Sequence, residues 1–182
     1  MLDFDASPVI AAVRTKDELT QAFSSDVEVI FYLTADIMTL RNEVNAAHSA
    51  GKKLFVHLDL AEGIGKDRCG LIYAKNLGVD GIISTRVNII KMARELGLVT
   101  VQRFFIVDSR SIDTTVESIK VSRPDMIEIM PGVVSKIISR ICTKVDMPVI
   151  AGGLIEEKSE IIAALKHGAA AVSTGKHKLW NE

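Results

Sequence analysis

The sequence has little net charge, few aromatic residues and no long apolar run. Its 22 basic and 23 acidic side chains leave a formal net charge of −1, so the whole molecule creates no field that attracts nucleic acid or an anionic membrane. Aromatic residues make up 5% of the chain. The apolar runs are a few residues long, whereas a membrane span needs roughly 20. We therefore expect no membrane partner, and any nucleic-acid site must come from a local cluster of charge.

Cysteine is also scarce. Cys69 and Cys142 are far apart, lack the spacing of a metal site and lie in apolar segments of helical pattern. We expect both to be buried thiols rather than a disulfide or a nucleophile. Residues 1–8 lack the basic and apolar regions of a signal peptide. Together these features predict a protein of the reducing cytoplasm.

The composition is that of a folded chain. Apolar residues make up 48% and charged residues 25% of the 182 residues, which suits a globular protein. This length can bury a core but is short for two ordinary domains. No linker or break in composition divides the chain. We therefore expect one domain over residues 1–182.

Short apolar runs rich in β-branched residues recur eight times. Runs of this kind are typical of strands that are covered on both faces. The expected strands are residues 8–13, 28–33, 53–58, 80–84, 99–106, 125–130, 148–151 and 169–173.

The gaps between these runs show helical periodicity, with signals for helix ends and starts. A glycine directly before a strand suits the left-handed residue that ends a helix. The glycines in this position are Gly51, Gly78, Gly97 and Gly168. Aspartates can cap free amides at helix starts. Three are placed for this role: Asp17, Asp67 and Asp113.

Eight alternating strands and helices favour a compact, closed parallel (β/α)8 barrel of the TIM type with short loops. An open, doubly wound sheet is the alternative, because periodicity cannot prove that the sheet closes.

The ends of the seventh and eighth expected strands predict a phosphate site. The seventh runs into Gly152 and Gly153, and the eighth ends at Ser173 and runs into Thr174 and Gly175. Glycines let backbone amides approach an anion, and barrels commonly hold a phosphate in the loops after these two strands. The alternative is a tight turn and a helix cap. The coincidence of both motifs favours the phosphate.

Several polar side chains are expected inside the barrel near the same end. The two-residue period puts His57 and Asp59 on one face, turns Glu128 inward and leaves either Gln102 or Arg103 inside, depending on register. Such a set suits acid–base chemistry, hydrogen bonds to a polyol or a polar plug. It contains no tight metal-ligand motif, so we expect no metal and no cofactor.

Two further segments follow strand ends. The glycine-rich stretch from Glu62 to Asp67 lacks the spacing of a nucleotide-binding loop, and it is either a cover over the ligand, with Glu62 or Lys66 in contact, or a plain connection. Arg86 follows the fourth strand and is either an anion partner or a solvated side chain.

An ordered set of motifs carries a family resemblance. The motifs are residues 8–13 (PVIAAV), 55–60 (FVHLDL) with 62–63, 80–85, 108–109, 127–132 (IEIMPG), 148–154 (PVIAGGL), and 171–174 with Leu179 and Trp180. Over nearly its whole length the chain resembles the glycerol uptake operon antiterminator family, the glycerol-3-phosphate-responsive regulatory proteins of bacteria.

The resemblance implies a barrel that senses glycerol-3-phosphate and, when liganded, binds leader mRNA to prevent premature termination of transcription. The two loop motifs would take the phosphate. His57, Asp59, Glu62 and Glu128 would lie near the glycerol part.

RNA binding rests on the resemblance alone. RNA affinity depends on Lys and Arg at phosphates and on exposed aromatic rings. The chain offers only a modest basic stripe of Lys136, Arg140 and Lys144 on one expected helix. A homodimer would double this stripe, but the sequence does not fix the oligomeric state.

An enzyme that acts on a small phosphorylated substrate, as an isomerase, lyase or phosphodiesterase, is the alternative function. Its motivation is that His57, Asp59 and Glu128 converge near the phosphate site. No lysine falls clearly within a strand as a Schiff-base candidate, which weakens an aldolase-like mechanism.

Overall fold

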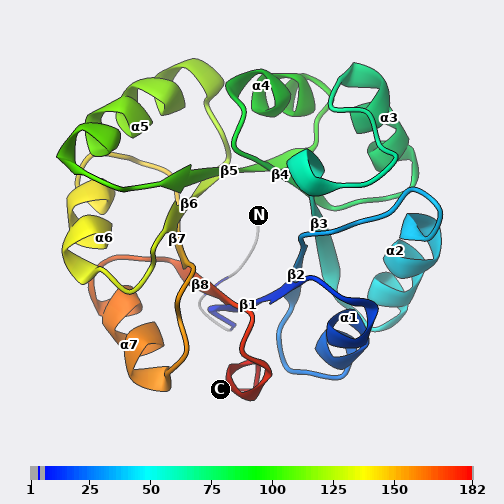
Figure 1. The fold of residues 1–182 in the computed structure, drawn as a ribbon, viewed down its shortest axis with the longest axis horizontal. Helices are drawn as coiled ribbons and strands as arrows, with labels where there is room; N and C mark the ends of the chain where they lie inside the picture. The colour runs from blue at the N-terminus through cyan, green and yellow to red at the C-terminus, as the bar shows by residue number, and fades with distance from the viewer. Residues whose placement is uncertain (1–3, 5–6, 182) are drawn as a thin grey trace.

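The sheet closes on itself. In the computed structural model, which describes residues 4 and 7–181, eight parallel strands pair in chain order and the last pairs with the first (Figure 1). The strands are β1 (Val9–Val13), β2 (Val29–Tyr32), β3 (Lys53–His57), β4 (Gly81–Ser84), β5 (Val99–Phe105), β6 (Met126–Met130), β7 (Val149–Gly152) and β8 (Ala171–Thr174). The expected closed barrel is confirmed, and the open-sheet alternative is wrong.

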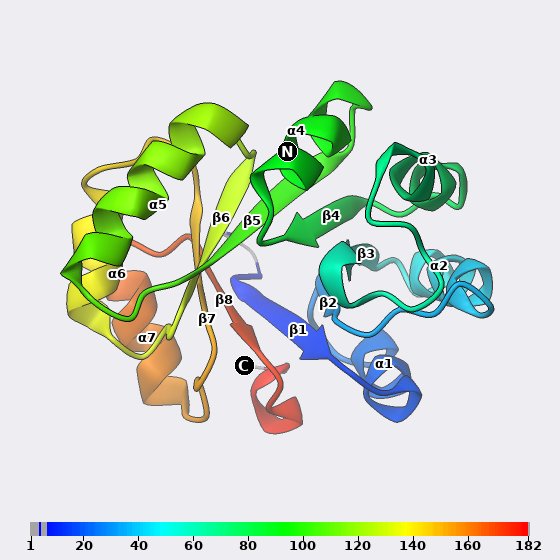
Figure 2. The same ribbon diagram turned by 45° about the horizontal axis from the view of Figure 1, so that its top comes forward.

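The helices surround the barrel (Figures 1 and 2). Over the described residues they are α1 (Lys16–Phe23), α2 (Leu40–Ser49), α3 (Arg68–Asn76), α4 (Val87–Glu95), α5 (Ser109–Ser122), α6 (Ser135–Cys142) and α7 (Lys158–Lys166). Two short 3-10 helices, η1 (Leu58–Leu60) and η2 (His177–Leu179), follow β3 and β8. None of the helices in this part of the chain is long and apolar enough to cross a membrane.

The expected helix ends are confirmed, but the expected starts are only partly right. The four glycines before strands all have a positive φ, between 72° and 101°. Asp67 caps α3, because its Oδ1 accepts from the Gly70 N–H at 2.9 Å. Asp17 lies within the first turn of α1, where Thr15 is the cap, and Asp113 lies inside α5, which Asp108 caps.

The two cysteines are not both buried. Cys69 is exposed in the first turn of α3, and Cys142, at the end of α6, is partly buried. The expectation of two buried thiols is therefore wrong for Cys69, whose side of α3 faces away from the barrel.

The interior of the barrel changes from apolar to polar along its axis. Away from the carboxyl ends of the strands, the interior is filled by an apolar cluster that includes Ile10, Ile150, Phe31 and Phe55. The ring centroids of Phe31 and Phe55 lie 5.7 Å apart. A second cluster lies between the strands and the helices. Full burial of each such side chain stabilises the fold by roughly 1.5–3 kcal/mol. Polar residues take over only at the carboxyl ends of the strands, and there the candidate site lies.

Candidate functional site

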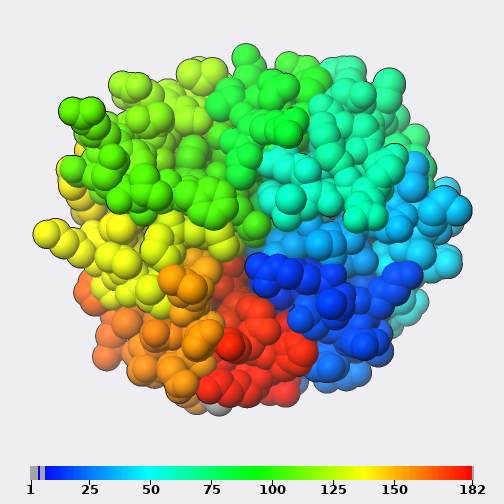
Figure 3. All heavy atoms as spheres, viewed as in Figure 1, coloured from blue at the N-terminus to red at the C-terminus, as the bar shows by residue number. Residues whose placement is uncertain are grey.

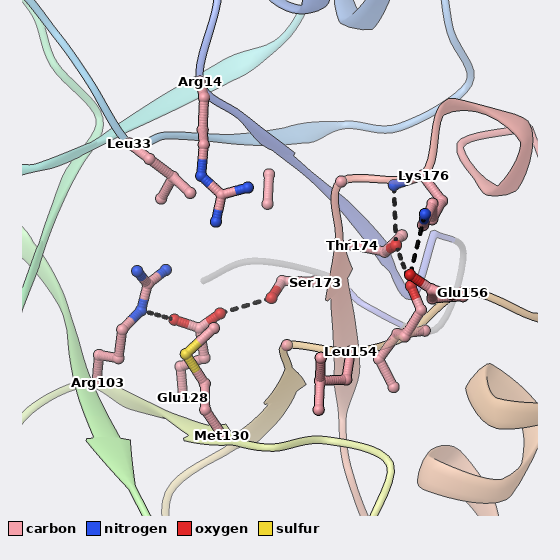
Figure 4. Close-up of a pocket in the computed structure, with 14 residues that line it drawn as sticks. Arg14, Leu33, Arg103, Glu128, Met130, Leu154, Glu156, Ser173, Thr174 and Lys176 are labelled. Carbon is pink, nitrogen blue, oxygen red and sulfur yellow. Dashed lines mark hydrogen bonds and ion pairs between the residues drawn. The ribbon is translucent and has the colours of Figure 1, made fainter.

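A cavity of about 340 Å³ opens at the carboxyl ends of β1, β5, β6, β7 and β8 (Figure 4). Four of the five residues predicted to bind phosphate line it: Gly153, Ser173, Thr174 and Gly175. The cavity wall thus brings together the two loops that the sequence singled out.

The loop after β7 has a backbone that favours glycine. Gly153 has φ of 76° and Leu154 has φ of 62°. Among the described residues, no acceptor pairs with the N–H groups of Gly153, Leu154 or Gly175. These three amides are therefore available to a ligand or to water, as an anion site requires.

Thr174 joins the two loops. Its hydroxyl donates to the Ile155 carbonyl at 2.7 Å and accepts from the Lys176 N–H at 3.1 Å. Its own carbonyl accepts from the Trp180 Nε1–H at 2.9 Å, which ties the loop to the buried indole. The hydroxyl of Thr174 is thus engaged within the protein, and its contribution is to hold the loops side by side.

Gly152 does not line the cavity. A Cβ added there would meet Glu128 Oε1 at 2.4 Å and Ser173 Oγ at 2.6 Å. Glycine is required at this position because the Glu128 and Ser173 side chains fill the space. Direct contact of Gly152 with a phosphate stays a prediction.

A buried ion pair forms one wall of the cavity (Figure 4). Arg103 Nε donates to Glu128 Oε2 at 2.5 Å, and Ser173 Oγ donates to Glu128 Oε1 at 2.5 Å. The open choice between Gln102 and Arg103 is thereby decided, because Gln102 points outward to Ser122 of α5. The terminal guanidinium nitrogens of Arg103 have no partner among the described residues and point into the cavity.

Sequence reasoning missed Arg14, one of the cations of this cavity. Arg14 follows β1 and directs its guanidinium into the cavity (Figure 4), with no carboxylate within ion-pair distance in the described chain. Lys176 follows Gly175 and pairs with Glu156 at 3.0 Å. A basic side chain directly after a strand end was the available signal for Arg14. Lys176 belongs to the short basic stretch of residues 176–178, which the sequence places beside the expected phosphate loop. With Arg103, three cations face two carboxylates, so the cavity favours an anion.

A second polar cluster follows β3 and β4. The strand β3 ends at His57, so Asp59 lies in η1 and not on the strand. Ser84 Oγ donates to Asp59 Oδ1 at 2.7 Å, and the N–H and hydroxyl of Thr85 donate to Oδ2 at 2.7 and 2.8 Å. The Arg86 Nε lies 3.8 Å from Asp59, and its side chain is exposed.

The pKa values of His57 and Asp59 are both lowered in this cluster, which favours a neutral imidazole and an ionised carboxylate at neutral pH. Burial, reinforced by the charge of Arg103, lowers the pKa of His57 to about 4, so the imidazole is neutral at pH 7. Burial alone would raise the pKa of Asp59, but the hydrogen bonds from Thr85 and Ser84 outweigh it and hold this pKa below its usual value. Neither ring nitrogen of His57 has a hydrogen-bond partner, and Nε2 lies 3.6 Å from Asp59 Oδ2.

His57, Asp59, Glu62 and Arg86 do not line the cavity. The Glu62 side chain is exposed, and its backbone pairs with Ala35 and Ile37. Lys66 donates to two carbonyls of its own loop, those of Ala61 and Ile64. Contact of these four predicted residues with a ligand stays a prediction. Within the described part of the chain, no three His, Cys, Asp or Glu side chains are grouped to hold a metal ion.

Comparisons with known proteins agree on one family. The family model described as glycerol-3-phosphate responsive antiterminator matches residues 9–180. The glycerol uptake operon antiterminator regulatory protein of Listeria monocytogenes str. 4b F2365 is 32% identical, with a TM-score of 0.93 over 98% of this chain and 97% of that one. A glycerol uptake operon antiterminator-related protein of Thermotoga maritima MSB8 is 31% identical, with a TM-score of 0.85 over 94% and 96%. The uncharacterized protein YgcP of Escherichia coli (strain K12) is 37% identical over 175 residues, which are 96% of this chain and 92% of that protein.

Proposed function

Since the chain belongs to the glycerol-3-phosphate responsive antiterminator family, we propose that it senses glycerol-3-phosphate, or a similar small phosphate ester, in the cavity at the carboxyl ends of its strands. We further propose that the liganded form binds leader mRNA in the cytoplasm. The protein acts in this account as a ligand-binding regulator.

The main observation behind the proposal is that one cavity is lined both by backbone amides and by guanidinium nitrogens that have no hydrogen-bond partner in the described chain. The amides of Gly153, Leu154 and Gly175 lie in the loops after β7 and β8, and the guanidinium groups of Arg14 and Arg103 point into the same space. Amides fix the position of an anion, and guanidinium groups bind its oxygens in a fork geometry. This combination suits a phosphate dianion better than a neutral polyol.

The hydroxyl end of the ligand would lie toward the polar layer inside the barrel. Glu128 accepts two hydrogen bonds from Arg103 and Ser173, and it borders the cavity. A hydroxyl group can donate to such a carboxylate and accept from the free guanidinium nitrogens. His57, with two unpartnered ring nitrogens, interacts electrostatically with Arg103 and would be a neighbouring polar group.

Calorimetry tests this proposal. Glycerol-3-phosphate should bind saturably, whereas glycerol at the same concentration should give no measurable heat, because the phosphate supplies most of the contacts. Equal binding of both compounds, or of neither, would contradict the proposed site. A second measurement, retention of leader RNA at low salt with and without the ligand, tests the RNA partner.

An enzyme acting on a small phosphorylated substrate is the second candidate. The feature that favours it is His57, a buried, neutral imidazole beside a carboxylate at the end of the barrel where such folds place catalysis. Incubation of saturating glycerol-3-phosphate with the protein, followed by phosphorus NMR, separates the two. The regulator leaves the phosphate ester unchanged, and the enzyme converts it.

A further inference from the structure

Charge is distributed unevenly around the barrel. Residues 91–144, from α4 to just beyond α6, contain nine basic and six acidic residues, and the remaining chain contains thirteen basic and seventeen acidic residues. Although the net charge of the whole chain is close to zero, this flank has an excess of positive charge. Figure 1 shows α5 and α6 together on one side, opposite α1 and α2.

A cleft of about 170 Å³ lies on this flank, between the start of α5 and α6. Its lining includes the buried side chains of Ile106 and Ile112, together with Lys136 and Arg140 of α6. Neither cation has an ion-pair partner in the described chain, whereas Lys144 pairs with Asp113. In the space-filling view the two segments, green and yellow, form one continuous flank (Figure 3).

The acidic residue nearest this cleft is engaged elsewhere. Asp108 accepts from the Ser111 N–H at 2.8 Å as the cap of α5, and these hydrogen bonds hold its pKa below the usual value. Its charge is directed at the helix amides rather than at Lys136 or Arg140. Asp113 of α5 pairs with Lys144 and also interacts electrostatically with Arg140, but it forms no ion pair with Arg140 or Lys136. Both cations can therefore meet an external anion.

An exposed aromatic residue ends the strand that leads into this cleft. Phe105, the last residue of β5, has 59% of its surface exposed, and Val107 has 86%. Among the described residues, no other Phe, Tyr or Trp is classed as exposed. Phe105 at the end of β5 and Lys136 in the first turn of α6 lie at the same end of the barrel. Single-stranded nucleic acids bind where exposed rings can stack with bases and nearby cations can meet phosphates.

We propose that Phe105, Lys136 and Arg140 form the surface that binds single-stranded RNA, with a base stacked on the ring and phosphates at the two cations. This inference rests on the proposed function, because it assumes that the liganded protein binds RNA. The unpaired charge favours RNA over a second copy of the chain, whose own residues 91–144 carry the same positive excess.

Backbone hydrogen bonds connect this surface to the ligand cavity. The Gly132 N–H, just before α6, donates to the carbonyl of Gly152 at 2.6 Å and, at 3.2 Å, to that of Gly153. The Ile106 N–H, next to Phe105, donates to the carbonyl of Met130, which lines the cavity, at 2.8 Å. A phosphate that orders the loop at Gly153 would thereby also order the start of α6, and this provides a physical route from ligand to RNA affinity.

The test begins with the wild type. A randomised RNA pool is passed over the wild-type protein at low salt with saturating glycerol-3-phosphate, and enriched RNA is labelled as the probe. If no RNA is enriched, the proposed RNA binding fails, and this surface fails with it. If RNA is enriched, the affinity of each variant for the labelled probe tests whether this surface is the one that binds it.

The decisive variant is Lys136→Ala/Arg140→Ala. Its matched control is Lys16→Ala/Arg41→Ala, which removes the same two side-chain types from α1 and α2. Loss of two phosphate contacts should weaken binding of the probe at least tenfold and reduce the slope of log K against log salt by about 1.4. The control should change affinity less than threefold. Equal loss in both variants, or none in the first, would overturn the assignment while leaving RNA binding itself intact.

The ring is tested by replacement that keeps its apolar character. Phe105→Leu should weaken binding of the probe about tenfold, because it removes the stacking surface, whereas Phe105→Tyr should retain wild-type affinity. Full affinity in the leucine variant would contradict stacking. Binding that needs a protein dimer, seen by sedimentation as two chains joined through this flank, would assign the surface to a second copy instead.

Discussion

The barrel carries two polar clusters at the same end, and they differ in which groups lack hydrogen-bond partners. In the cluster after β3 and β4, Asp59 is satisfied and the buried ring nitrogens of His57 are not, whereas in the loops after β7 and β8 backbone amides and guanidinium nitrogens are open. Asp59, after β3, receives three hydrogen bonds from Ser84 and Thr85 and is held by its neighbours. Around Gly153 and Gly175, after β7 and β8, amides have no acceptor in the described chain, and Arg14 has no carboxylate partner. Polar residues at the end of a barrel are therefore insufficient to locate a ligand. Amide and guanidinium donors without a partner, which suit an anion, are the basis on which we propose the phosphate site.

The ion pair in the wall of the cavity gives the largest expected effect. Arg103→Leu should destabilise the protein by about 3–5 kcal/mol, because it leaves the Glu128 carboxylate buried without its partner. The double variant Arg103→Leu/Glu128→Leu should recover most of that stability but still bind no glycerol-3-phosphate. Urea unfolding measures the first effect and calorimetry the second. A double variant as unstable as the single one would contradict a cost that arises from the unpaired charge.

The glycine loop gives the next largest effect, on binding. Gly153→Asp should weaken the binding of glycerol-3-phosphate at least 100-fold, which corresponds to about 2.7 kcal/mol. The new carboxylate would repel the phosphate, and its Cβ would lie 3.1 Å from Met130 Cε. Gly51→Asp is the control, since Gly51 has a similar φ, 72°, with no atom within 4 Å of a new Cβ. Intact affinity in Gly153→Asp would show that the loop does not bind the phosphate.

His57 makes a smaller contribution that depends on pH. Its pKa of about 4 in the folded protein lies below the ordinary value of 6.5, so the unfolded chain binds more protons between these values and stability falls as the solution is acidified. From pH 6.5 to 5 the loss should be about 2 kcal/mol. His57→Leu should flatten this part of the curve of unfolding free energy against pH. An unchanged curve would mean that His57 is not held neutral by burial.

Asp59 gives the smallest expected effect on the ligand and sharpens the contrast between the clusters. Asp59→Asn should cost about 1.5 kcal/mol of stability, because hydrogen bonds from Ser84 and Thr85 lose a charged acceptor. Affinity for glycerol-3-phosphate should change less than threefold in calorimetry. A loss of more than tenfold would place Asp59 on the ligand, as the sequence predicted.

The sequence alone predicted the architecture well, because local signals determine it. Eight apolar runs became eight strands, displaced by one or two residues at their ends, and the glycines before strands ended the helices as expected. Closure of the sheet could not be derived, because pairing of β1 with β8 joins segments far apart in the chain.

The site was harder to predict, because it depends on direction and on partners. Alternation could not decide between Gln102 and Arg103 until the register of β5 and β6 was known. Asp59 was assigned to the face of a strand, but the chain turns into η1 directly after His57. Arg14 went unnoticed, since one arginine after a strand is usually solvated, and only the closed barrel brings it opposite Arg103.

Amide chemical shifts measure the central claim most directly. In a nitrogen-15 labelled sample titrated with glycerol-3-phosphate, we expect the largest shifts at the N–H groups of Gly153, Leu154 and Gly175, with the Thr85 N–H, which is bonded to Asp59, nearly unchanged. Glycerol alone should move none of them. Shifts centred on Thr85, with Gly153 and Gly175 unmoved, would contradict a phosphate site between β7 and β8.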